Sequence, residues 1–340
     1  MIDINLDLVR DFEDYVLNDI KNAKNNGFSF ENYNEWKKEE IIKINKEIDN
    51  FKNLGLDTKD IKKRLETKAL KEAYEKHLIY TYSALRERII PIKPRKISYV
   101  KNFKRIPEYE DGLVFLEKKI LSGENLLPHM SRQIFDTSSK DGLLYDFGIQ
   151  HLHLGLKPDP KNPKLIKGRE KVLYCVVDDE NVYFLVIDNH GHWGDIELVR
   201  LIKNNFPNLI KPFELNVQRL SAHLTEEERI KLRKIGINTP IEVDGKCYMS
   251  LGWGVNTAGT STNAVIKMDR YYQYYKNVEI NFKQFINDNI DSLRNILKEE
   301  NKYNFVAQSI SPIILLDKDN NVKISLELVY DQIKIIGIEC

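Results

Sequence analysis

Residues 171–187 read KVLYCVVDDENVYFLVI and indicate a β-hairpin near the middle of the chain. The β-branched and aromatic residues of this run favour extended backbone. The apolar pattern stops only at residues 178–181, Asp-Asp-Glu-Asn, which are residue types that form turns. The sequence therefore predicts two antiparallel strands joined by a short turn.

A histidine pair lies on each side of this hairpin. His151 and His153 precede it, and His190 and His192 follow it, so four of the seven histidines border one small sheet. Side chains two residues apart in a strand point to the same face. Each pair therefore presents two imidazoles side by side, and we expect all four to line a common pocket at one end of the strands.

The first part of the chain has a helical pattern. Between residues 6 and 88, apolar side chains such as Ile41, Ile44 and Ile48 recur at spacings of three and four among charged residues. We expect two or three long amphipathic helices there, ended by the prolines at positions 91 and 94. The fold class predicted from these patterns is α+β. A helical region would cover residues 1–104, and an α+β domain built on an antiparallel sheet would cover residues 105–340 and carry the histidine pairs.

Cap and turn residues predict the remaining elements. Helices are expected after Thr225, after the glycine-rich loop of residues 252–262, and over residues 109–121, 138–147, 196–206 and 282–298. Strands are expected over residues 312–316, 322–328 and 332–338, and Asp244-Gly245 predicts a further tight hairpin. The prolines and glycines of residues 157–171 predict a long surface loop.

The charge balance argues against a strong overall attraction to nucleic acid or to an anionic membrane. The 340 residues include 52 basic and 51 acidic side chains, which gives a formal net charge of +1. Any basic surface must therefore be local. The best candidate is the predicted loop of residues 157–171, where Lys157, Lys161 and Arg169 lie close in sequence to the histidine pairs.

Cysteine usage and the N-terminal sequence predict the compartment. The three cysteines, Cys175, Cys247 and Cys340, are odd in number and form no Cys-x-x-Cys motif, which suits a reducing environment. The N-terminus has acidic residues where a signal peptide has basic ones, and no apolar run approaches the roughly eighteen residues of a membrane span. We therefore expect a cytoplasmic protein without a membrane partner.

Paired histidines suit general acid–base catalysis because imidazole changes its charge near neutral pH. One imidazole can take the proton of an RNA 2′-hydroxyl group while another donates a proton to the leaving 5′-oxygen. The pattern therefore predicts a metal-independent endoribonuclease that acts on RNA without a cofactor. The predicted catalytic residues are His151, His153, His190, His192, Lys171 and Tyr174, and the predicted substrate-binding residues are Lys157, Lys161, Arg169, Thr260, Ser261 and Thr262.

Three other interpretations stay open at this point. His-x-His on a strand is also a ligand spacing, which allows a histidine-bound divalent metal and a metal-dependent hydrolase or nuclease, with Asp188 or Asp195 as a further ligand. The histidines could instead be structural and bond to loop backbone at the ends of the sheet. The chain could also be a non-enzymatic interaction protein that binds a protein partner through its N-terminal helices.

Several segments carry a resemblance to bacterial proteins. FGIQHLHLG at residues 147–155, HGHW at residues 190–193 and the loop of residues 252–262 resemble signature segments of a bacterial family of uncharacterised chemistry. Residues 172–192 are similar to the central hairpin of RelE-type ribonuclease toxins, in which helices precede an antiparallel sheet with the catalytic groups. This resemblance covers residues 109–206 and carries over no single residue. It implies a ribonuclease toxin or an effector of antiviral defence against phage.

Overall fold

The computed structural model describes residues 3–192, 194–217, 220, 224–293, 296–297, 302–329 and 332–339. Trp193 of the second histidine segment and Cys340 lie outside these residues. Contacts between Cα atoms group the chain into two compact units. Unit 1 comprises Met1–Asn26, Trp36–Ile79 and Lys267–Cys340, and unit 2 comprises Gly27–Glu35 and Tyr80–Ile266. The boundary expected at residue 104 rests on a change in residue pattern, which is a different criterion, and it stays a prediction.

The expected N-terminal helices are present. They are α1 (Leu8–Asn25), α2 (Tyr33–Asn53), α3 (Lys59–Lys63) and α4 (Thr67–Arg88). Within unit 1, α1 buries a stripe of apolar residues at helical spacing, from Leu8 through Phe12 to Ile20. The Phe12 ring stacks on Tyr275 of α10 (Thr262–Asp288) with 4.8 Å between ring centroids. The periodicity of the sequence predicted these helices. Of the predicted apolar residues, Ile44 and Ile48 are buried in α2, whereas Ile41 is half-buried.

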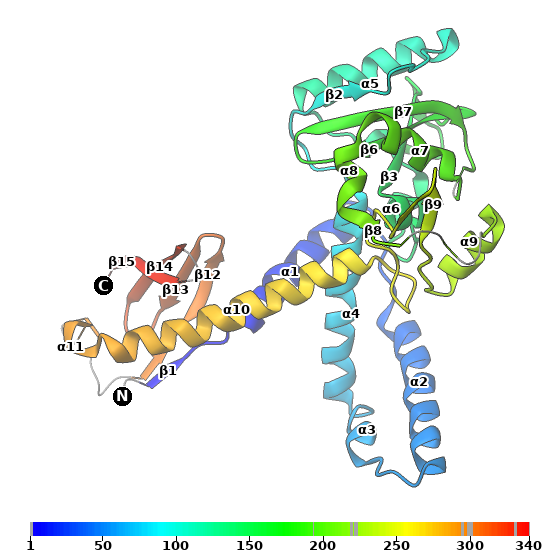
Figure 1. Ribbon diagram of the computed structural model, residues 1–340. Helices are drawn as coiled ribbons and strands as arrows, with labels where there is room; N and C mark the ends of the chain where they lie inside the picture. The colour runs from blue at the N-terminus through cyan, green and yellow to red at the C-terminus, as the bar shows by residue number, and fades with distance from the viewer. Residues whose placement is uncertain are drawn as a thin grey trace. The chain divides into compact units, whose positions relative to one another are not determined.

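The C-terminal part of unit 1 is an antiparallel four-stranded sheet (Figure 1). Its strands follow one another in order as β12 (Val306–Ile310), β13 (Ile313–Asp317), β14 (Val322–Val329) and β15 (Gln332–Glu339). The three predicted strands correspond to the last three of these, whereas β12 was not predicted. A separate two-stranded parallel pair joins β1 (Asp3–Asn5) to β11 (Lys302–Asn304).

The helix predicted over residues 282–298 is confirmed for residues 282–288, but there it continues α10 and is not a separate helix. Most of its first part belongs to α10, and only the short helix α11 (Ile290–Leu293) follows in the described residues. No glycine or proline interrupts residues 262–288, so nothing in the backbone ends the helix that begins at Thr262.

Unit 2 is built around a four-stranded sheet in the order β2 (Lys96–Tyr99), β7 (Asn181–Asn189), β6 (Lys171–Val177) and β3 (Ile149–His153). The predicted hairpin is the antiparallel pair of β6 and β7. β3 pairs with β6 in antiparallel fashion, and β2 pairs with β7 in parallel fashion. The sheets of the described chain are mostly antiparallel, so the α+β prediction is confirmed.

Helices cover both faces of this sheet (Figure 1). On one face, Leu113 and Leu116 of α5 (Glu110–Ser122) pack with Leu152, Cys175 and Phe184 in one apolar cluster. The opposite face carries a second cluster, to which Phe147 of α6 (Gly142–Phe147) and Val199 of α7 (Ile196–Asn205) belong. The sheet is therefore a rigid central layer, and its strand ends hold their side chains in fixed positions.

The predicted surface loop at residues 157–171 is wrong in part. It contains a small antiparallel hairpin formed by β4 (Pro158–Asp159) and β5 (Asn162–Ile166), which lies outside the main sheet. Leu165 and Ile166 are buried, so part of this segment is anchored by apolar contacts that its prolines and lysines conceal in the sequence.

Smaller elements complete unit 2. A three-stranded sheet has the order β8 (Glu214–Leu215), β10 (Lys246–Tyr248) and β9 (Ile241–Val243). Its tight turn uses the predicted Asp244 and Gly245, both with positive φ, at 48° and 74°. The other helices are η1 (Pro107–Tyr109), η2 (Leu127–His129), η3 (Arg132–Phe135), α8 (Pro207–Ile210), η4 (Lys211–Phe213) and α9 (Glu226–Lys234). None of the helices in the described residues is both long and apolar enough to cross a membrane.

Candidate metal centre

The strand register brings the two histidine segments to the same end of the sheet. β3 and β7 are both antiparallel to β6, so they run in the same direction. Val172 of β6 pairs with His153 on one side and with Asp188 on the other. His190 follows the end of β7 by one residue, and its backbone N–H donates to the carbonyl of Glu170 over 3.3 Å. The end of β7 therefore delivers His190 beside the histidines of β3.

His151, His153 and His190 form a close cluster. One nitrogen of each ring lies within 4.8 Å of the corresponding nitrogens of the other two. The ring centroids are 5.9 Å apart for His151 and His153, 5.0 Å for His151 and His190, and 5.1 Å for His153 and His190. Two nitrogen ligands of a tetrahedral zinc ion are about 3.4 Å apart. The three side chains therefore form a candidate ligand set for one metal ion.

Burial keeps these imidazoles neutral at pH 7. Burial first, and then the neighbouring histidines, lower the pKa of His151 to about 3 and that of His153 to about 4. Burial also lowers the pKa of His190, although this residue is the most exposed of the three. Neutral imidazole is the form that binds metal ions, whereas a general acid must be protonated. The environment of the cluster therefore favours metal binding over proton donation.

His129 supports the cluster and was missed from the sequence. It lies at the end of η2 and is completely buried. Its Nδ1 lies 2.8 Å from the backbone carbonyl oxygen of His153, which requires that Nδ1 carries the proton and donates it. Its Nε2 is buried and has no hydrogen-bond partner. The only sign in the sequence is an isolated histidine among the apolar residues 126–130, which is as typical of a core histidine as of a site.

The burial of His129 predicts how the free energy of unfolding depends on pH. Burial lowers the pKa of His129 from its usual 6.5 to about 4. The unfolded chain therefore binds more protons between pH 6.5 and 4, and the free energy of unfolding should fall as the pH drops through this window, by about 3 kcal/mol for this group. Urea unfolding of metal-free protein at pH 7 and at pH 4.5 measures the fall. H129Q keeps a donor for His153 but does not titrate, so an equal fall in H129Q and wild type would contradict this assignment.

The other predicted catalytic residues belong to a neighbouring polar group around Asp188. His192 is not a member of the three-histidine cluster, and its nitrogens lie 3.6 Å from Asp188 and 3.2 Å from Asp195. Lys171 Nζ is 3.3 Å from the same Asp188, and the buried Tyr174 hydroxyl donates to the carbonyl of Asn189 over 2.8 Å. The structure thus brings together three of the four histidines that were expected to share a pocket, and it places His192 in a separate set of contacts.

The predicted basic residues lie on exposed parts of unit 2. Lys157 and Lys161 are exposed in and beside the β4–β5 hairpin. Arg169 is also exposed, and its guanidinium lies over the Tyr109 ring at 4.1 Å and donates to the carbonyl of Glu108. Arg169 therefore holds its own segment against η1.

The predicted hydroxyl donors are engaged within the loop that starts α10. Ser261 is completely buried, donates to the Glu87 carboxylate and accepts from the backbone N–H of Ala264 over 3.1 Å. Thr260 accepts from the side chain of Asn256 over 2.8 Å. Thr262 is the first residue of α10. These contacts organise the start of the helix, and the predicted role of the three hydroxyls in substrate binding stays a prediction.

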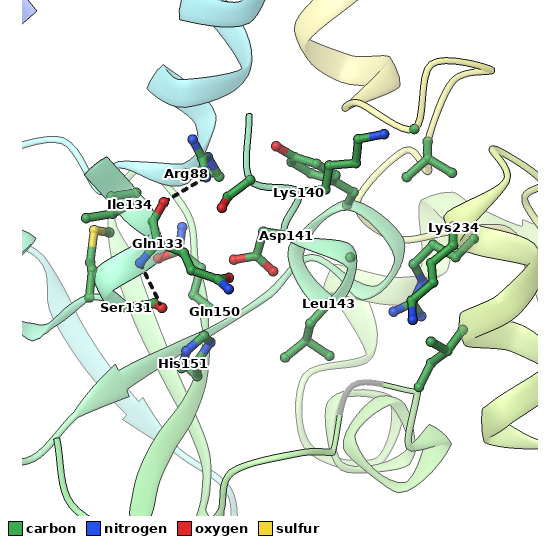
Figure 2. A pocket seen from close by; sticks show the side chains of 18 residues that line it. Arg88, Ser131, Gln133, Ile134, Lys140, Asp141, Leu143, Gln150, His151 and Lys234 are labelled. Carbon is green, nitrogen blue, oxygen red and sulfur yellow. Dashed lines mark hydrogen bonds between the residues drawn. The ribbon is translucent and has the colours of Figure 1, made fainter. Parts of the chain in front are cut away.

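A cavity of about 350 Å³ adjoins the cluster. His151 is one of its lining residues, together with Gln150 on the same strand (Figure 2). β3 is an edge strand, so side chains from both of its faces can reach a cavity at that edge. A volume of this size lies within the range of small-molecule sites, about 300 to 1,000 Å³.

Comparison of the chain with protein-family models, with curated proteins and with solved structures found no match. The class of site is therefore defined by its own residues: three neutral imidazoles at the end of a buried sheet, beside a cavity of ligand size.

Proposed function

We propose that the chain is a metal-dependent hydrolase that holds one divalent ion through His151, His153 and His190. The observation that carries this proposal is the convergence of three ligand nitrogens within 4.8 Å of one another. An all-nitrogen set of three suits zinc and the neighbouring transition metals. No carboxylate or cysteine joins the cluster in the described residues, so three protein ligands would leave coordination positions open, as in catalytic rather than structural zinc sites.

The three histidines would hold the ion, and its chemistry there would be the activation of water and the polarisation of an ester or phosphoester oxygen. His151 and His153 are fixed by their strand, and His129 ties the backbone of His153 through its Nδ1. His190 is the exposed member of the three. His151 also lines the cavity and so connects the ion to the space in which a substrate would bind.

RNA cleavage without a metal remains the competing prediction. It requires one imidazole as a base and a protonated one as an acid. The lowered pKa values of His151 and His153 suit them as bases and not as acids at pH 7. An acid–base enzyme would therefore have to take its acid from His190, His192 or another group.

Metal analysis and a chelator experiment test the proposed function. We expect chelator-treated protein to bind about one equivalent of Zn²⁺ in calorimetry. We also expect hydrolysis of total RNA or of bis(p-nitrophenyl) phosphate to stop in EDTA and to resume with one added ion.

RNA cleavage that persists in EDTA, with a bell-shaped pH profile, would support the acid–base enzyme instead. Absence of both metal binding and hydrolysis by folded protein would contradict the hydrolase. It would favour an interaction protein that binds a partner through its N-terminal helices.

A further inference from the structure

Arg88 is a buried cation on the wall of the cavity beside the histidine cluster. It ends α4 and is 5% exposed. Its Nη1 donates to the carbonyl of Gln133 over 3.4 Å, and its Nη2 donates to the carbonyl of Asp136 over 3.0 Å. Its Nε is buried and has no hydrogen-bond partner. No ion pair joins Arg88 to a carboxylate in the described residues, although the carboxylates of Asp136 and Asp141 lie near enough for their charges to interact with it.

A buried guanidinium that forms no direct ion pair with a carboxylate is costly in a protein interior. Burying a charge is unfavourable unless it is paired and hydrogen-bonded, and two backbone carbonyls satisfy only part of a group with five N–H donors. The Nε–H and the nearest Nη–H of a guanidinium point in the same direction and can grip two oxygens of a carboxylate or phosphate. Arg88 lies in the wall of the cavity (Figure 2). An anion bound in the cavity would therefore provide the ion-pair partner that the guanidinium lacks.

Other charges on the wall favour an anion as well. Lys140 donates to the carbonyl of Ala258 over 2.6 Å, which leaves its charge uncompensated, and Lys234 is exposed at the wall. Arg233 contributes less, because the carboxylate of Asp146 lies 2.6 Å from it.

One acidic residue also lines the cavity. Asp141 caps α6 by accepting from the backbone N–H of Leu144 over 3.0 Å. Arg88, Lys140 and Lys234 together outweigh this single carboxylate. The buried Oε1 of Gln150 has no hydrogen-bond partner, and Met130 and Leu143 supply apolar wall. The cavity therefore combines a cationic end that suits an anionic group with a surface that suits the uncharged part of the same ligand.

We propose that this cavity is the substrate pocket and that it takes a small organic anion, with its phosphate or carboxylate group on Arg88. The inference rests on the proposed function, because His151 is the residue that the cavity shares with the metal centre. It narrows the substrate from hydrolysable esters in general to small anionic ones. A guanidinium accepts phosphate and carboxylate alike, so the experiment has to separate the two.

Calorimetry on metal-free protein tests the pocket separately from the metal. The probes are phenyl phosphate, benzoate and the neutral benzyl alcohol. We expect wild type to bind at least one of the two anions and not the alcohol, and the preferred anion identifies the group. R88Q should weaken that binding about 10- to 100-fold, the range for losing a hydrogen bond to a charged group. R86Q is the matched control, since Arg86 is exposed on the same helix two residues away, and it should bind as wild type does.

Further variants keep the test decisive. If R88Q does not fold, R88K and K234Q replace it in the test. R88K keeps the positive charge but cannot form the bidentate hydrogen bonds of a guanidinium, and K234Q removes the charge of an exposed lining residue. Both variants should weaken anion binding, R88K more strongly. R88Q that folds should still bind Zn²⁺, and H153A should lose Zn²⁺ but keep the anion. Failure of metal binding alone would overturn the proposed function and leave the anion pocket standing. Absence of anion binding by wild type, or equal binding by the Arg88 variants and R86Q, would overturn the pocket.

Discussion

Replacing His153 by alanine is expected to lower the affinity for Zn²⁺ by more than about a hundredfold. His153 offers one of the three clustered ring nitrogens, and its ring centroid lies 5.9 Å from that of His151 and 5.1 Å from that of His190. Loss of an outer partner of a metal ligand already costs about 10- to 100-fold in affinity or activity, and a direct ligand should cost more. Calorimetry with Zn²⁺ and hydrolysis rates at a fixed low zinc concentration measure the loss. Far-UV circular dichroism establishes that the variant is folded.

H192A is the matched control for H153A. His192 lies at the same end of the sheet but contacts Asp188 and Asp195 instead of the cluster. H192A should therefore bind Zn²⁺ as wild type does. The acid–base hypothesis predicts a different result. If it holds, H151A and H192A would each lower the rate of RNA cleavage in the presence of chelator by roughly two to four orders of magnitude. Loss of zinc binding in H192A to the same degree as in H153A would contradict the three-ligand assignment.

The part of the site that the sequence could predict is the part that depends on local periodicity. Side chains two residues apart in a strand point to the same face, so His151 and His153 had to lie side by side once β3 formed. The β6–β7 hairpin then fixed the end of β7 next to them through its register. His192 differs because β7 ends at Asn189, and the same-face rule does not extend into the turn that follows.

The supporting residues could not be predicted in this way. His129 reaches His153 from 24 positions away, and Arg88 reaches the cavity from the end of a helix whose sequence predicts only an amphipathic arm. Both positions follow from tertiary packing, which leaves no periodic signal in the sequence. The same limit explains β12 and the β4–β5 hairpin, because pairing partners decide whether a short, mixed run becomes a strand.

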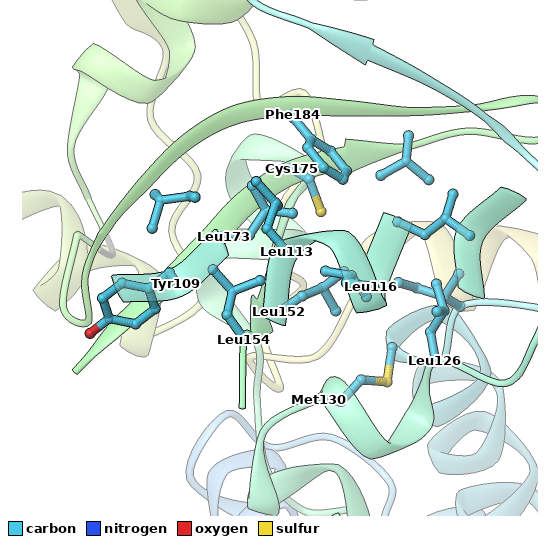
Figure 3. Packing of buried hydrophobic residues seen from close by; sticks show 14 of the residues in the cluster. Tyr109, Leu113, Leu116, Leu126, Met130, Leu152, Leu154, Leu173, Cys175 and Phe184 are labelled. Atoms are coloured by element: carbon cyan, nitrogen blue, oxygen red, sulfur yellow. The ribbon is translucent and has the colours of Figure 1, made fainter. Parts of the chain in front are cut away.

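The close approach of α5 to the chain just after β3 leads to a second large effect. Gly112 lies in the first part of α5, and a Cβ atom at this position would be 1.9 Å from the carbonyl oxygen of Leu154 and 2.8 Å from its carbon. Both are backbone atoms, so no side-chain rotation can relieve the clash. Figure 3 shows Leu113 of the same helix and Leu154 within one buried apolar cluster, which would have to separate for the helix to move.

We therefore expect G112A to lower the free energy of unfolding by about 3 kcal/mol or more, at the upper end of the range for overpacking. Because Leu154 follows His153 directly, a displaced backbone would also weaken Zn²⁺ binding. Urea unfolding and zinc calorimetry on the same preparation measure the two effects. G337A is the control, since a Cβ there meets nothing within 4 Å and the change should stay within about 0.5 kcal/mol. If G112A and G337A have the same free energy of unfolding, α5 does not hold the histidine-bearing strand β3 in place.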